Sequence, residues 1–376
     1  MAHKEVDNTK VDNIQVEEPD LGNIVQPLIN WYRENKRDLP WRHNPDAYRV
    51  WISEIMLQQT RVEAVKGYYD RFLKALPTVK DLAEAEEDKL LKLWEGLGYY
   101  NRVRNMQKAA QQIMVDYAGT FPDTYEEILQ LKGIGNYTAG AISAFAYGIP
   151  KSAVDGNVLR VISRITGSYE DIMKQSVRKK IEHALEQVIP ADAASDFNQG
   201  LIELGAIVCV PNGEPKCAEC PVKEYCIAHA EDLTAEIPVK KKAKARKIEE
   251  RTVLIFKDGK RIAIRKRPAK GLLAGLYEFP NVEGKLSMDE VTEYSKKIGL
   301  MPVRVQELPE AKHIFSHIEW HMTGYAVQID ETEQEYQNML FVDVKETEEQ
   351  YPIPAAFSRY TGYMNIRLGN DRYKEE

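Results

Sequence analysis

The sequence predicts a mainly α-helical region followed by a smaller α+β domain, and three observations support this division. Between about Ile24 and Ala230, apolar residues recur at three- and four-residue spacing, as on one face of a helix. Beyond residue 250, apolar and polar residues alternate, as in half-buried strands. All four cysteines of the 376-residue chain lie between Cys209 and Cys226, at the end of the helical region.

Changes in composition and periodicity place the boundaries. They predict a disordered polar tail (1–25), a helical domain (26–230), a basic interdomain linker (231–250) and an α+β domain (251–376). In the helical domain the periodicity predicts helices at 48–61, 63–75, 86–94, 102–117, 124–131, 137–146, 157–165, 176–188 and 198–208.

The elements of the α+β domain have local signals. The segments 252–256 and 261–266 alternate around Asp258-Gly259, a pair that suits a type I′ hairpin turn. Ser287 and Glu290 have capping-box spacing and open a helix that Gly299 can close. Residues 313–329 are rich in β-branched and aromatic side chains and predict further strands.

The net charge of −7 is unevenly distributed. Residues 227–270 carry +8 and residues 271–376 carry −9, so a basic belt precedes an acidic region. Such a belt suits either phosphate binding or a solvated linker. The lack of a long apolar run and of an apolar N-terminal segment predicts a cytoplasmic protein, with no membrane partner.

The cysteines Cys209, Cys217, Cys220 and Cys226 have the spacing of one metal site, the loop 209–226. Four close thiolates can hold zinc or a 4Fe-4S cluster. Zinc sites usually pair two C-x2-C knuckles, and only Cys217 and Cys220 have that spacing here. The pattern therefore favours the iron–sulfur cluster.

A glycine pair and an aspartate precede this loop. Gly133 and Gly135 lie between two predicted helices, where the chain can turn sharply and offer N–H groups to an anion such as a DNA phosphate. Asp155 precedes the helix predicted at 157–165 and is either a plain N-cap or an ionised carboxylate stabilised by the helix dipole.

The glycine hairpin, the aspartate and the cysteine loop together resemble the helix-hairpin-helix DNA glycosylase superfamily over about residues 26–230. The stretches 39–42 (LPWR), 50–60 (VWISEIMLQQT) and 94–100 (WEGLGYY) resemble the MutY-type adenine DNA glycosylases. In the related endonuclease III branch a lysine amine attacks the sugar, and Tyr137 stands at that position here. Strand cleavage by β-elimination should therefore be weak or absent.

Glu54 can be judged on its neighbours as well. Within residues 50–57 only Ser53 and Glu54 are polar, so burial should raise the pKa of Glu54 and keep it protonated near neutrality. The resemblance implies that Glu54 protonates N7 of a flipped adenine and that Asp155 stabilises the oxocarbenium-like sugar. It also implies that Tyr137 and Asn157 hold this site, that Arg42 lies near the carboxylates, and that DNA is contacted by Gln59, Thr60 and Tyr99, with Gln59 and Tyr99 as wedges in the base stack.

The α+β domain resembles the Nudix fold at residues 271–280, but its helix at 289–297 lacks the Glu-rich pattern that carries magnesium. Recognition is thus a better interpretation than catalysis. In MutY-type proteins a Phe-Ser-His loop of this domain senses 8-oxoguanine, and Phe315, Ser316 and His317 stand in that place. A serine hydroxyl can accept a hydrogen bond from the N7–H that 8-oxoguanine has and guanine lacks.

The sequence thus predicts a monomeric, monofunctional adenine glycosylase of base excision repair. Its expected substrate is double-stranded DNA with adenine opposite 8-oxoguanine or guanine, and its expected location is the nucleoid. Three alternatives remain at this point: a DNA-structure binding protein, a thymine-glycol glycosylase/lyase and a nucleotide pyrophosphatase. The pair of carboxylates, Tyr137 and the altered Nudix helix argue against them in turn.

Overall fold

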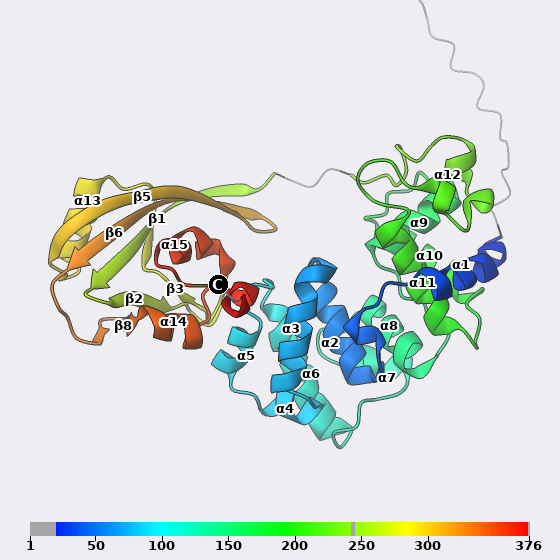
Figure 1. Cartoon of the computed structure of the whole chain (residues 1–376), viewed down its shortest axis with the longest axis horizontal. Helices are drawn as coiled ribbons and strands as arrows, with labels where there is room; N and C mark the ends of the chain where they lie inside the picture. The colour runs from blue at the N-terminus through cyan, green and yellow to red at the C-terminus, as the bar shows by residue number, and fades with distance from the viewer. Residues whose placement is uncertain (1–19, 242–244, 375–376) are drawn as a thin grey trace, which may run out of the picture. The chain divides into compact units, whose positions relative to one another are not determined.

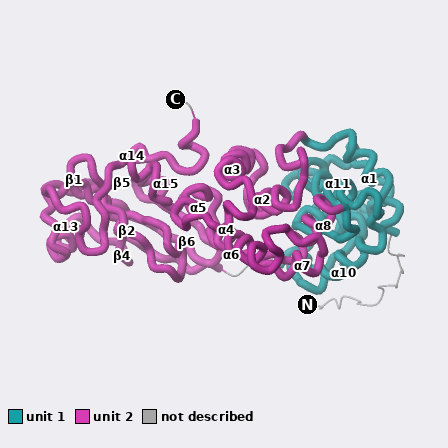
Figure 2. Tube along the Cα trace, turned by 90° about the horizontal axis from the view of Figure 1, so that it is seen from below, with its two compact units in different colours: residues 1–37, 148–241 teal, residues 38–147, 242–376 magenta. Residues whose placement is uncertain are grey.

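The computed structural model describes residues 20–241 and 245–374. They form two compact units, coloured separately in Figure 2. Unit 1 contains residues 20–37 and 148–241, and unit 2 contains residues 38–147 and 245–374. The helical region is therefore divided between the units, and the sheet belongs to the same unit as helices α2 to α8.

Unit 1 is helical. Its longer helices are α1 (Gly22–Asn35), α9 (Gly156–Ile165), α10 (Gln175–Glu186) and α11 (Ala194–Ile207), followed by two short 3₁₀ turns and α12 (Ile227–Ala230) (Figure 1). Helix α1 buries Ile24, Leu28 and Tyr32, and α11 meets it at Gly200, where an added Cβ would lie 3.2 Å from Leu28. A small residue at this crossing lets the two helices pack closely.

The helical part of unit 2 begins with the 3₁₀ turn η1 (Pro40–Arg42). The helices that follow are α2 (Ala47–Leu57), α3 (Val62–Ala75), α4 (Val79–Glu84), α5 (Glu87–Leu93), α6 (Asn101–Asp116), α7 (Tyr125–Gln130) and α8 (Asn136–Tyr147). They share one core, in which Trp51, Phe72 and Trp94 are almost fully buried. Helix α2 packs against α8 within it.

The rest of unit 2 is a mixed sheet. Its strands are β1 (Lys247–Asp258), β2 (Arg261–Lys266), β3 (Tyr277–Glu278), β4 (Asn281–Glu283), β5 (Pro302–Ile314), β6 (Ile318–Ile329), β7 (Glu335–Tyr336) and β8 (Met339–Asp343). The order is β5-β6-β1-β2-β8-β7, with β1 and β6 parallel and β5 and β6 antiparallel. Helices α13 (Met288–Lys297), α14 (Val344–Gln350) and α15 (Ser358–Tyr363) accompany it, with the 3₁₀ turns η4 (Ala355–Phe357) and η5 (Gly369–Tyr373).

Strand alternation explains why this sheet has a core on each face. Val253 and Ile255 of β1 pack with Phe357 and Tyr360, near the C-terminus. Their neighbours in sequence, Leu254 and Phe256, point to the opposite face and pack in the core that contains Val291 of α13. This α+β domain and the helical region before it confirm the predicted fold class.

Each of the nine predicted helices is present, with ends displaced by no more than four residues. The capping box of Ser287 and Glu290 is also confirmed, and Gly299 follows α13 with φ of 78°. The predicted hairpin is confirmed, but its turn is not of type I′. Asp258 pairs with Arg261, so the turn residues are Gly259 and Lys260, and only Gly259 has a positive φ, of 58°.

Two boundary predictions need correction. Helix α1 starts at Gly22, inside the predicted tail 1–25, because Leu21 and Ile24 are buried; residues 1–19 of that tail lie outside the described residues. In the predicted linker, Ile237 is 1% exposed and β1 already begins at Lys247, while 242–244 lie outside the description. The domain boundary near residue 250 otherwise stays a prediction.

Hydrogen bonds join the sheet domain to the helices of unit 2. The buried carboxylate of Glu95 accepts a bond from Lys92 Nζ and from the N–H groups of Ile353 and Gly369, at 2.9, 2.9 and 3.3 Å. Burial raises the pKa of Glu95 and lowers that of Lys92, and each partner opposes the shift of the other. Sequence patterns give no sign of this buried pair, because its main-chain partners lie more than 250 residues away.

Candidate active site and DNA interface

Glu54 lies in the middle of α2 and is 6% exposed. Its neighbours in the helix are buried apolar side chains, as the sequence predicts. The hydroxyl of Tyr137, from α8, donates a hydrogen bond to Glu54 Oε2. The structure therefore brings together two of the predicted catalytic residues, one from each of two packed helices.

The glycine hairpin fixes the start of α8. Gly133 has φ of 80°, and an added Cβ would lie 2.6 Å from Asn105 Cβ, so this turn requires glycine. Gly135 has open space around it, and both glycines are exposed before the first turn of α8. Tyr137 is the second residue of this helix, so the hairpin also determines where its phenol lies.

Asp155 is the N-cap of α9. Its Oδ1 accepts hydrogen bonds from the N–H groups of Asn157 and Val158, both at 2.8 Å, and its Oδ2 accepts one from Asn157 Nδ2 at 2.7 Å. Burial raises the pKa of Asp155, and these three bonds oppose that rise because they stabilise the carboxylate. Asp155 is thus the N-cap of α9, and the same hydrogen bonds stabilise its carboxylate. The two roles that the sequence offered for it are therefore compatible.

Asn157 links this aspartate to the cysteine loop. Arg160 Nη2 donates to Asn157 Oδ1 at 2.9 Å, and Arg160 Nε donates to the carbonyl of Cys209 at 2.8 Å. Arg160 is 4% exposed, and its burial lowers its pKa. Arg160 and Arg164 lie four residues apart in a short apolar helix. This pattern indicates buried hydrogen-bond partners, and the sequence analysis missed it.

The four cysteines line one cavity of unit 1, together with apolar side chains and the polar residues Arg164, Lys223, His229 and Thr234. Arg164 Nη1 lies 3.2 Å from Cys209 Sγ, and burial raises the pKa of Cys220 to about 12. Within the described parts of the chain, no three His, Cys, Asp or Glu side chains stand together closely enough to hold a metal ion. The all-sulfur donor set and the buried arginine nevertheless fit a negatively charged cluster.

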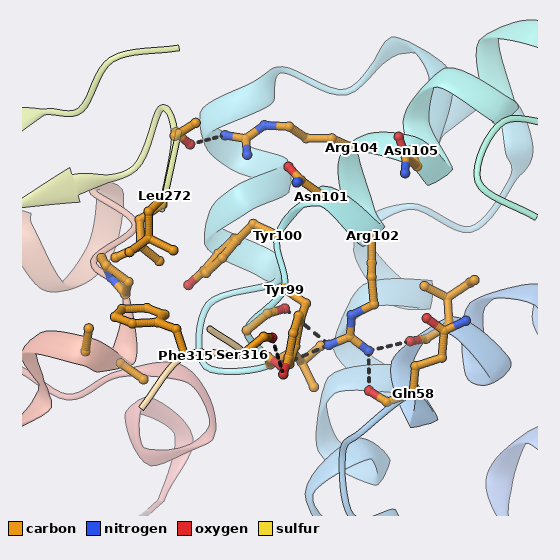
Figure 3. A pocket seen from close by; sticks show the side chains of 18 of the residues that line it. Gln58, Tyr99, Tyr100, Asn101, Arg102, Arg104, Asn105, Leu272, Phe315 and Ser316 are labelled. Atoms are coloured by element: carbon orange, nitrogen blue, oxygen red, sulfur yellow. Dashed lines mark hydrogen bonds between the residues drawn. The ribbon is translucent and has the colours of Figure 1, made fainter. Parts of the chain in front are cut away.

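A pocket of about 870 Å³ lies within unit 2, between the helical part and the sheet domain. Figure 3 shows Tyr99, Arg102, Phe315 and Ser316 around it. Gly133 and His317 also line this pocket. It therefore brings together predicted DNA-binding residues from the glycine hairpin, from the loop before α6 and from the sheet domain.

The loop that joins β5 to β6 carries Phe315, Ser316 and His317. Phe315 packs edge-on against His313 and Trp320, with ring centroids 4.6 and 4.9 Å away, and its N–H donates to the carbonyl of Ile318 at 2.8 Å. Ser316 and His317 are exposed at the tip of this hairpin, and Ser316 Oγ lies 3.5 Å from Tyr99 Oη. The anchored phenylalanine thus presents two polar side chains at the pocket.

The two predicted wedge residues share an unusual backbone. Gln59 has φ of 59° and Tyr99 has φ of 48°, and both side chains are exposed. Thr60 follows Gln59 and is half-buried, and Arg42 is half-buried in η1. A positive φ is rare for residues other than glycine, and no sequence pattern reveals it here. The sequence analysis also missed Arg102, which lies between the two wedge loops, 58–60 and 96–99.

Two parts of the chain match known protein families. Residues 52–189 match the HhH-GPD superfamily of base excision DNA repair proteins, and residues 251–361 match the NUDIX domain. The adenine DNA glycosylase of Buchnera aphidicola subsp. Acyrthosiphon pisum is 35% identical over 81% of this chain and 86% of its own length. The chain belongs to the adenine DNA glycosylase family.

One further adenine DNA glycosylase and one solved glycosylase structure are also similar to this chain. The mouse adenine DNA glycosylase is 34% identical over 81% of the chain and 70% of its own length. A thermostable thymine-DNA glycosylase of known structure matches 56% of this chain and 96% of its own with 30% identity and a TM-score of 0.50. The family makes the protein a DNA glycosylase of base excision repair. None of the helices within 20–241 and 245–374 has the length and apolar character to cross a bilayer.

Proposed function

We propose that this DNA glycosylase hydrolyses the N-glycosidic bond of adenine mispaired with 8-oxoguanine, or with guanine, in double-stranded DNA. The observation that carries the proposal is the buried Glu54 with its Tyr137 partner, on a chain of the adenine DNA glycosylase family. A carboxylic acid in an apolar helix is suited to protonate a flipped base, and protonation makes that base a better leaving group.

Asp155 supplies the complementary charge. Its carboxylate carries three hydrogen bonds at the start of α9, and it can stabilise the positive charge that develops on the sugar as the bond breaks. Asn157 orients it, and Arg160 orients Asn157. Water then completes the hydrolysis, and because Tyr137 offers no amine, the enzyme leaves an abasic site rather than a nicked strand.

The cysteines Cys209, Cys217, Cys220 and Cys226 would hold a 4Fe-4S cluster. Four cysteine thiolates are the usual donors to such a cluster, and the four cysteines line one cavity of unit 1. Arg164 would balance the charge of the thiolates. With their thiolates held at one centre, the four cysteines would fix the loop 209–226, and this loop is joined through Arg160 to Asn157, which orients Asp155.

Recognition of the lesion belongs to the sheet domain. Ser316 would accept the N7–H of 8-oxoguanine at the pocket, while Gln59 and Tyr99 fill the space left by the extruded adenine. Extrusion costs a few kcal/mol of stacking and pairing, less at a mispair than in matched DNA. The hairpin at Gly133 and Gly135 would hold a backbone phosphate, and we propose that the monomer works in the cytoplasm, at the nucleoid.

The test is single-turnover base release from duplexes with one central adenine opposite 8-oxoguanine, guanine or thymine. We expect release to be fastest opposite 8-oxoguanine, and strand breaks only after alkali. Ser316→Ala should lower the preference for 8-oxoguanine over guanine by about 3- to 10-fold, the value of one hydrogen bond. Ser358→Ala, an exposed serine of the same domain, is the control. Absence of adenine release from every duplex would refute the proposal.

A further inference from the structure

The guanidinium of Arg102 lies between the two loops that carry Gln59 and Tyr99. Arg102 Nη1 donates to the carbonyls of Ile55 and Gln58, both at 2.6 Å, at the C-terminal end of α2. Arg102 Nη2 donates to the carbonyls of Leu97 and Gly98, at 2.9 and 3.2 Å, in the loop before α6. Figure 3 shows the side chain reaching across from Tyr99 to Gln58.

The position of Arg102 in its own helix is unfavourable. It is the second residue of α6, where the helix dipole repels a positive charge. Burial also disfavours the charged guanidinium and lowers its pKa to about 10, which still leaves it charged at neutral pH. The carbonyls at the end of α2 and in the loop before α6 offset these costs by accepting hydrogen bonds from the guanidinium, and that of Gly98 also accepts one from Trp94 Nε1.

Both loops need such a constraint. The backbones of Gln59 and Tyr99 are in the left-handed region, at φ of 59° and 48°. Such conformations persist in residues other than glycine only where the surroundings determine them. The same guanidinium lies over the rings of Tyr99 and Trp94, with its carbon 5.6 and 5.3 Å from their centroids.

We infer that Arg102 is a positioning residue for base extrusion: its planar fork holds the two wedge loops in one fixed arrangement, so that Gln59 and Tyr99 enter the base stack together. The inference rests on the proposed function. The hydrogen bonds of Arg102 go to the main chain at these loops, so we assign it to base extrusion rather than to bond cleavage. A lysine carries its three donors on a single nitrogen and lacks the planar fork that spans the distance between the two loops.

The test compares two duplexes in single turnover. In the first, the target adenine is paired opposite 8-oxoguanine; in the second, it lies in a one-nucleotide bulge, where less stacking and pairing must be broken. Relative to the wild type on the same duplex, Arg102→Lys should be about 10- to 100-fold slower on the paired substrate, the size of effect that misplacement produces. On the bulged substrate the loss should stay below about 3-fold.

Lys108→Gln is the matched control, because Lys108 is an exposed cation of the same helix. It should affect both duplexes alike and only slightly. An equal loss on both duplexes by Arg102→Lys would show a general effect on folding or DNA affinity and would overturn the inference, as would no loss on either. Thermal unfolding of each variant, followed by circular dichroism, accompanies the rates.

Hydrogen exchange of the wild-type protein tests the fork without catalysis, and it decides the matter should Arg102→Lys not fold. If one guanidinium holds both loops, the amides of 58–60 and 96–99 should open with the same free energy. Independent opening of the two loops would refute the inference. A wild type that releases no adenine but whose two loops open together would refute the proposed function. It would still support the role of Arg102 in holding both loops.

Discussion

Glu54 and Asp155 are both carboxyl groups in a helical context, but their surroundings differ. Glu54 lies within α2 among apolar side chains and receives a hydrogen bond from the neutral hydroxyl of Tyr137. Asp155 lies at the start of α9 and receives two backbone N–H groups and one amide. The first setting suits a group that gives up a proton, and the second suits a group that keeps a negative charge.

Substitution of Glu54 should have the largest effect on this comparison. Glu54→Gln preserves shape but removes the transferable proton, so single-turnover release of adenine should fall by about 100- to 10,000-fold. Binding of the mispaired duplex, measured by fluorescence anisotropy, should change little. Glu63→Gln, an exposed glutamate at the start of α3, serves as control and should retain the wild-type rate. A comparably active Glu54→Gln would remove Glu54 as the acid.

Substitution of Asp155 should also change how the rate of base release depends on pH. Asp155→Asn should slow base release by about 100- to 1,000-fold, the scale of one lost electrostatic contact to the transition state. In the wild type the ionised form is the active one, so the rate should fall as the pH drops through the pKa of Asp155. Because burial raises that pKa, this acid limb should lie above the value of about 3.9 that is ordinary for aspartate.

Asp155→Asn is the control for this acid limb. Its pH profile should lack the limb, because asparagine does not ionise. Asp192→Asn, at an exposed position of the same unit, should retain both the rate and the limb. An acid limb that persists unchanged in Asp155→Asn would assign it to another group, and the contrast between the two carboxyl groups would lose its support.

Asn157 allows the comparison to be sharpened without removing either carboxyl group. Asn157→Ala deletes the amide that donates to Asp155 Oδ2 and loses a bond to a charged group, which predicts a rate about 10- to 100-fold lower. That bond stabilises the carboxylate, so its loss should raise the pKa of Asp155 further and move the acid limb to higher pH. A slower enzyme with an unmoved limb would show that Asn157 acts elsewhere.

The two carboxyl groups also differ in how far the sequence could predict them. The N-cap role of Asp155 depends on residues within three positions, and the apolar surroundings of Glu54 depend on one helical turn, so both are readable locally. Glu95 and Arg102 are not, because their hydrogen-bond partners, apart from Lys92 beside Glu95, are main-chain groups. For Glu95 these come from the far end of the chain, and main-chain groups leave no trace in residue identity.

The wedge loops show the same limit at the backbone level. The motif resemblance selects Gln59 and Tyr99, but their positive φ angles occur without glycine or asparagine at those positions, in loops whose carbonyls accept hydrogen bonds from Arg102. Likewise, the division of the chain into units places residues 38–147 with the sheet. A linear change in composition could mark only the sequence boundary near residue 250.

Tyr137 should show the smallest effect. Tyr137→Phe removes one neutral hydrogen bond to Glu54 and leaves the ring packed in α8, so base release should slow by no more than about 10-fold. Tyr147→Phe removes a phenol hydroxyl from the same helix that bonds to the carbonyl of Phe121 instead, and should leave the rate unchanged. A loss in Tyr137→Phe as large as that in Glu54→Gln would mean that the pair acts as one unit. The proton would then be shared between phenol and carboxyl group, and the acid would be the pair rather than Glu54 alone.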